Sequence, residues 1–162
     1  MKKAIRVLQF IWLLPATFLL WFFYVLPLMF IGAIRLIGYP EFLIAEFSVD
    51  KNKSPDWYYK LWVGWSGYGG PCFFISNPSV DPDYNARVKR HELEHCYQQF
   101  RLGVFFYLYY VLAYLWLLAF TKKHPYIDNP LEIAARKAAG QSVTVSRSEW
   151  IDNNGKRILW RK

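Results

Sequence analysis

The chain has 162 residues, of which 54% are hydrophobic and 20% aromatic, and its formal net charge is +8. This length allows one domain and a membrane element but excludes two full domains. The high Trp and Tyr content is typical of proteins that contact a membrane interface. Because the Lys and Arg residues are scattered or flank apolar runs, the charge indicates an anionic lipid partner, and we expect no nucleic-acid partner.

An apolar run from residue 4 to residue 34 predicts a membrane anchor, and Arg6 is its only charged residue. A bilayer core needs roughly 20 apolar residues, so the run is long enough to span. It is too long for a signal peptide, and no small-residue cleavage site follows it. We therefore expect residues 1–37 to form an uncleaved transmembrane helix kinked at a proline, or a tight helical hairpin.

Basic residues crowd the N-terminal side of this run, which bears on its orientation. For a single pass, the positive-inside rule places the N-terminus in the cytoplasm and the rest of the chain outside. A hairpin reverses that conclusion. In both cases we expect a membrane location, the inner or plasma membrane for a bacterial or phage protein, with the side of the remaining domain left open.

Residues 38–162 are expected to form one α+β domain. Short strands bounded by glycine turns, two helices and a C-terminal hairpin are predicted along it. The strands are 42–49, 61–65 and 72–76, the helices begin near Asp83 and at Pro130, and the hairpin turns at Asn154-Gly155. Cys72 and Cys96 are too few for a disulfide scaffold, so we expect both to be small buried side chains.

A second apolar run, at 103–120, lies between charged residues and just reaches the length of a membrane span. It contains four tyrosines, whose hydroxyl groups would each need a hydrogen-bond partner inside a bilayer. This composition favours a helix that packs on the domain or lies in the membrane interface, without a full crossing.

The segment His91-Glu92-Leu93-Glu94-His95 has the HExxH pattern. On a helix, His91 and His95 lie on one face and can share a metal ion. Glu92 stands beside them as a general base, with zinc as the Lewis acid. A solvated helix rich in charge would produce the same residues, and that alternative stays open. A catalytic site also needs a third protein ligand.

The stretch HELEHCYQQ, followed by an apolar run and NPLEIAA, resembles small HExxH proteins of the gluzincin type. The resemblance covers about residues 88–139. It implies a zincin-like domain, a zinc ion, and Glu132 as the third metal ligand. It also implies that Gln98 helps to orient a metal ligand. The strands lie outside the resemblance, and we expect them to form a short antiparallel sheet in this domain. The charged residues Lys89 and Glu94 depart from the pattern, which normally has uncharged residues at both positions.

Other residues compete for these roles. His124 and Asp128 are alternative third ligands, and Tyr97 and Tyr126 are candidate oxyanion donors. A capping glutamate is the alternative role for Glu132, because it occupies the third position of a helix.

Two functions follow from this interpretation. The first is a membrane-associated zinc metallopeptidase that hydrolyses a peptide or protein substrate at the membrane surface. The second is a non-catalytic membrane protein that binds lipid or a protein partner, with an incidental or vestigial HExxH. The first requires residues 103–120 not to cross the bilayer, because a crossing would put His91 and Glu132 in different compartments.

Overall fold

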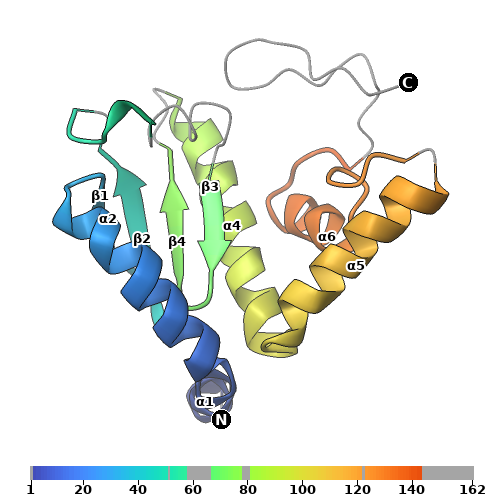
Figure 1. The fold of residues 1–162 in the computed structure, drawn as a ribbon, viewed down its shortest axis with the longest axis horizontal. Coiled ribbons are helices and arrows are strands. Elements are labelled where there is room, and N and C mark those ends of the chain that lie inside the picture. Colours follow the sequence, from blue (N-terminus) through green and yellow to red (C-terminus); the bar gives the residue numbers. More distant parts are fainter. Residues whose placement is uncertain (1, 51, 58–66, 78–80, 122, 144–162) are drawn as a thin grey trace.

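The computed structural model describes the chain except residues 1, 51, 58–66, 78–80, 122 and 144–162. It is an α+β arrangement in which an N-terminal helical run crosses one face of a four-stranded sheet and a long helix, α4, packs behind the sheet (Figure 1). Helices α5 and α6 pack beside α4. The helical elements are α1 (Lys2–Leu20), η1 (Trp21–Val25), α2 (Leu26–Phe30), α4 (Pro82–Leu102), α5 (Phe105–Phe120) and α6 (Pro130–Ala138).

The N-terminal run is one continuous helix, so the hairpin alternative does not form. Among the described residues, Ile5–Phe30 is the single unbroken helix long and apolar enough to cross a bilayer. Its η1 part is π-helical, and the Leu26 amide donates to the carbonyl of Trp21. The irregular turn directly precedes Pro27, which has no amide hydrogen to continue the ordinary helical pattern.

The sheet is mixed, whereas an antiparallel sheet was expected. Its order is β1-β2-β4-β3, in which β2 pairs parallel with β4 and the other two pairs are antiparallel. The chain between the parallel strands supplies β3, which pairs with β4 on the outer side. The strands are β1 (Ile34–Glu41), β2 (Ile44–Val49), β3 (Gly67–Gly70) and β4 (Phe73–Ser76).

Two predicted strands, 42–49 and 72–76, correspond to β2 and β4. The predicted strand 61–65 and the C-terminal hairpin lie outside the described residues. Strand β1 begins inside the range assigned to the anchor, because the apolar run continues into its first residue, Ile34; most of the strand after Ile34 is exposed. Strand β3 was predicted as turns, since three of its four residues are glycine.

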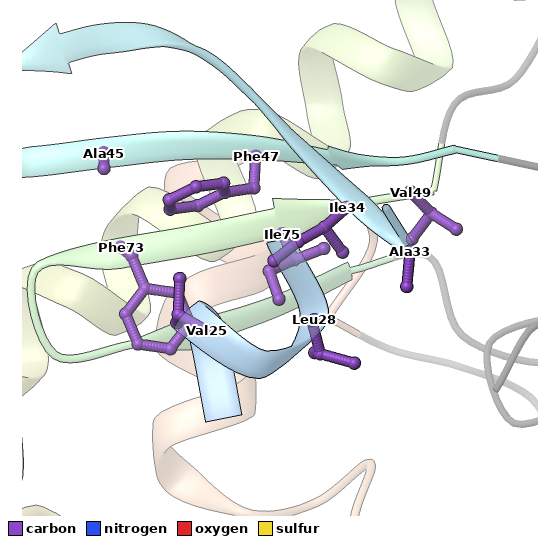
Figure 2. Close-up of a cluster of buried hydrophobic side chains, with 9 residues drawn as sticks. All are labelled: Val25, Leu28, Ala33, Ile34, Ala45, Phe47, Val49, Phe73 and Ile75. Atoms are coloured by element: carbon purple, nitrogen blue, oxygen red, sulfur yellow. The ribbon is translucent and has the colours of Figure 1, made fainter. Parts of the chain in front are cut away.

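The core is divided between the two faces of the sheet. On the side of η1 and α2, Phe47, Phe73 and Ile75 pack with Val25 and Leu28 (Figure 2). A second cluster joins α1, β2, β4 and α4; its buried residues are Leu13, Ile44, Cys72, Phe74, Cys96 and Phe100. Both cysteines are free and buried, as predicted.

Helix α4 ends at a sharp bend before α5. The two helix axes meet at 112°, and Gly103 between them has a positive φ of 59°. A Cβ atom on Gly103 would lie 1.4 Å from Trp12 Nε1, so only glycine lets α1 approach the bend this closely. The bend turns the apolar run 103–120 back beside α4, where it can reach the residues of the HExxH segment.

Candidate metal centre

Helix α4 places the two histidines of HELEH on one face. Asp81 caps the helix by accepting hydrogen bonds from two backbone amides of its first turn, and Pro82 occupies the first position. The helix is unbroken through His91 and His95, which are four residues apart. Their Nε2 atoms lie 3.2 Å from each other, and His95 is buried. The two histidine rings therefore lie side by side, as the four-residue spacing predicts.

Helix α6 brings Glu132 to the same point. Asn129 caps α6 by accepting a hydrogen bond from the Leu131 amide, and Pro130 begins the helix, as the NPLE sequence predicts. The Glu132 carboxylate faces α4, with Oε2 3.3 Å from His91 Nε2 and Oε1 3.4 Å from His95 Nε2. Glu132 therefore contacts both histidines of α4 and is more than a capping residue of its own helix.

The three side chains form a buried group that can hold a metal ion. Donor atoms bound tetrahedrally at roughly 2.0–2.1 Å are separated from each other by about 3.3–3.4 Å. The separations in this group are 3.2, 3.3 and 3.4 Å. Two imidazole nitrogens and one carboxylate also leave a fourth coordination position for another ligand. The group therefore fits a metal ion in size and in chemistry.

Two glutamines orient the histidine rings. Gln98 donates from Nε2 to the carbonyl of Leu131, so its Oε1 is free to accept from His95 Nδ1, at 2.9 Å. Gln141 Oε1 lies 3.0 Å from His91 Nδ1. A hydrogen at Nδ1 leaves the Nε2 lone pair of each ring for the shared ligand. Gln98 was expected near the site, whereas nothing in the sequence connects Gln141, fifty residues away, with His91.

Helix α5 contributes its tyrosine hydroxyls to this region. Tyr110 donates to Glu132 Oε1 at 2.9 Å, and Tyr107 donates to Gln99 at 2.8 Å. The Asn129 side chain also donates to the backbone carbonyl of Tyr110, which ties α5 to the start of α6. Two of the four tyrosines in the second apolar run thus bind polar partners inside the protein. Helix α5 therefore lies against the site, and His91 and Glu132 are on the same side of this helix.

Glu92 is buried on the face of α4 that contacts β3. Its carboxylate lies close to the backbone of Gly69, whose carbonyl accepts from Gln99 Nε2 at 2.9 Å. A Cβ on Gly67 would lie 2.7 Å from the Glu92 carboxylate, and one on Gly69 would lie 2.7 Å from the Cβ of His95. Bare backbone at these positions lets the edge strand press against the helix beside the histidines.

The group is electrostatically coupled in the absence of a metal. Burial lowers the pKa of His95, but the hydrogen bond and charge of Glu132 and the charge of Glu92 raise it more, to about 9. Burial raises the pKa of Glu132, yet its bonds to His91 and His95 hold that pKa well below the usual range. For Glu92, burial raises the pKa above that of an ordinary carboxyl group despite both histidines. The site stabilises positive charge between two carboxylates.

The competing ligands have other roles. His124 Nδ1 accepts hydrogen bonds from the amides of Tyr126 and Ile127, and Asp128 accepts from the His124 amide at 2.7 Å. His124 and Asp128 therefore shape the loop before α6. Of the two candidate oxyanion donors, Tyr126 lies near the site, where burial and the charge of Glu132 raise its pKa well above the usual range.

The other donor, Tyr97, lies under the guanidinium of Arg6, whose central carbon is 5.1 Å from the centre of the tyrosine ring.

The two charged residues that depart from the HExxH pattern, Lys89 and Glu94, each form an ion pair. Lys89 binds Glu46 at 2.6 Å, and Glu94 binds Arg101. Both pairs use groups outside the His91, His95 and Glu132 cluster.

Comparisons of the chain with protein-family models, with curated proteins and with solved structures find no match.

Proposed function

We propose that this protein is a membrane-associated, zinc-dependent hydrolase that cleaves a peptide bond at the membrane surface. The observation that carries the proposal is the convergence of His91, His95 and Glu132 from two helices, with Glu92 on the same helix as the histidines. This is the residue set that the resemblance to HExxH peptidases implies. The ion pairs of Lys89 and Glu94 support it, because they keep those extra charges away from the metal ligands.

Zinc is the metal that we assign to the group. Two neutral imidazoles and one carboxylate with an open fourth position are a typical catalytic zinc set, and the donor separations suit zinc bond lengths. When bound, zinc would supply a Lewis acid that polarises the carbonyl of the substrate. Gln98 and Gln141 would keep both Nε2 atoms directed at the ion by holding the other ring nitrogens.

Glu92 is assigned as the general base. Glu92 does not belong to the three-residue ligand group, although the charges of both histidines act to lower its pKa. Burial raises its pKa toward the range in which a carboxylate can accept a proton from water and return it to a leaving amine. The close packing of Gly67 and Gly69 against Glu92 would hold its carboxylate in place during this exchange.

The proposal is tested with the full chain in anionic lipid vesicles, incubated with a mixture of unstructured peptides whose new termini are read by mass spectrometry. The wild type should cleave peptides, and Glu92→Gln should keep its zinc but lose cleavage by at least about 100-fold. Glu94→Gln is the matched control on the same helix and should retain both properties.

Zinc-loaded wild type that cleaves none of the peptides would contradict hydrolysis and favour a non-catalytic membrane protein. Loss of zinc from Glu92→Gln equal to that from His91→Ala would show that Glu92 is a ligand and not the base.

A further inference from the structure

The N-terminal helix packs against the domain along nearly its whole length. Near its start, Arg6 forms an ion pair with Glu41 at 2.9 Å. Leu13 is fully buried in one core cluster, and Leu28 is buried in the other. Between them, Trp21 packs edge-on against aromatic rings of β2 and β4. These contacts recur at helical spacing, so one stripe of the helix faces the protein from end to end.

Strand β2 lies alongside this stripe. Its first residue, Ile44, shares a cluster with Leu13, and its last residue, Val49, shares a cluster with Leu28. The helix and the strand therefore occupy the same depth over roughly 17–20 Å, the length of the six residues of β2. If the helix crossed a bilayer, the sheet would enter the hydrocarbon with it.

An open sheet cannot occupy that position. In the part of the chain that the structure describes, the sheet has two edges, β1 and β3, and the unpaired backbone groups of an edge strand have no hydrogen-bond partners in lipid. A bilayer core is about 30 Å thick, so a helix standing upright would put most of β2 in its interior. The geometry excludes an upright crossing of a helix that stays packed on the sheet.

The outer face of the helix is nevertheless strongly apolar. Large side chains that point away from the domain are exposed on it; they include Leu8, Phe18, Phe22 and Phe30. Helix α5 has a second such face, which includes Leu112 and Trp116. The two faces meet where Trp12 and Phe105 are in ring contact, with centroids 6.0 Å apart. Together they are far larger than the scattered apolar residues of a soluble surface.

Basic residues lie beside both apolar helices. Lys2 and Lys3 begin the first helix in the sequence, and exposed Arg35 follows it. Helix α5 itself has no charged residue, and exposed Lys123 follows it. Cations next to an apolar face fit a surface of anionic lipid headgroups over acyl chains, and the net charge of +8 acts in the same direction.

We propose that the protein is monotopic: the outer faces of α1–α2 and α5 rest together in one leaflet of an anionic bilayer, and neither helix crosses it. This inference rests on the membrane association in the proposed function but not on hydrolysis. It replaces the transmembrane anchor that the length of the apolar run favours. It also leaves the whole metal centre on one side of the membrane, because α4 and α6 lie behind these faces.

The test uses the full chain in bacterial membranes, with Lys3→Cys or Arg35→Cys labelled by a membrane-impermeant maleimide. Wild type, whose Cys72 and Cys96 are buried, supplies the background. Both variants should be labelled in the same preparation, either spheroplasts or inverted vesicles. Labelling of the two cysteines from opposite sides would overturn the proposal.

A second measurement gives the depth of the helix. Spin labels at Leu8, Phe18 and Phe30 in vesicles of phosphatidylglycerol and phosphatidylethanolamine should all report a shallow depth of about 5–10 Å. A crossing helix would instead place the Phe18 label near the bilayer centre, with the other two labels at the surfaces. Absence of binding to these vesicles would equally refute the proposal. Zinc content is unaffected by either outcome, so failure here is distinguishable from failure of the proposed enzyme.

Discussion

Tyr110 on α5 donates its hydroxyl hydrogen bond to Glu132 Oε1 on α6 at 2.9 Å. The bond joins an apolar helix, whose composition suits a membrane, to the carboxylate that completes the metal centre. It explains why an apolar run contains a buried phenol, and it fixes one oxygen of Glu132 while the carboxylate faces both histidines. Tyr110 is therefore a positioning residue for the third ligand.

Tyr110→Phe should weaken zinc affinity about 10- to 100-fold, the usual effect of losing an outer-shell partner. Tyr109→Phe is the matched control, because Tyr109 is its exposed neighbour on the same helix. Competition with a chelator of known affinity measures both variants. Equal affinity of the two variants would show that the hydroxyl does not position Glu132.

The glycines of β3 should be intolerant of side chains. Gly69→Ala puts a Cβ about 2.7 Å from the backbone oxygen of Glu92 and from the Cβ of His95. Overpacking of this kind typically lowers the free energy of unfolding by about 1–3 kcal/mol. Gly38→Ala in β1, where the added Cβ has no atom within 4 Å, should change it by less than about 1 kcal/mol. Denaturant unfolding in detergent compares the two, and similar losses would contradict the close packing of β3 on α4.

Zinc binding should release a proton from His95. The pKa of His95 is about 9 in the metal-free protein, so at pH 7.5 the ring holds a proton that must leave before Nε2 can bind a metal. Apparent affinity should therefore rise with pH up to about pH 9, and the contribution of this residue should level off above it. Calorimetry in two buffers of different ionisation enthalpy counts the protons. A binding enthalpy independent of the buffer would contradict the prediction.

Local patterns in the sequence predict the parts of the site that depend on one helix. The four-residue spacing of His91 and His95, and the cap and proline before Glu132, each describe a helix that the structure contains. The contacts of Tyr110 and Gln141 join residues that are 22 and 50 positions from their partners. No periodicity relates such positions, so sequence reasoning could not find them.

The fold was predicted less completely than the site. Strand β1 begins at Ile34, the last residue of the apolar run, and an apolar run by itself does not show where a helix ends and a strand begins. Glycine-rich β3 has almost no side chains to show alternation, and its glycines are needed for the approach of α4. The parallel pairing of β2 and β4 depends on where the intervening chain returns, which neither strand specifies by itself.

The central claim is that His91, His95 and Glu132 bind one zinc ion together. The most direct measurement is the zinc content of the full chain, purified in detergent and equilibrated with limiting free zinc, by mass spectrometry of the metal. The account predicts about one zinc per chain in the wild type and little in His95→Ala or Glu132→Ala. Wild type without zinc, or undiminished zinc in both variants, would contradict it.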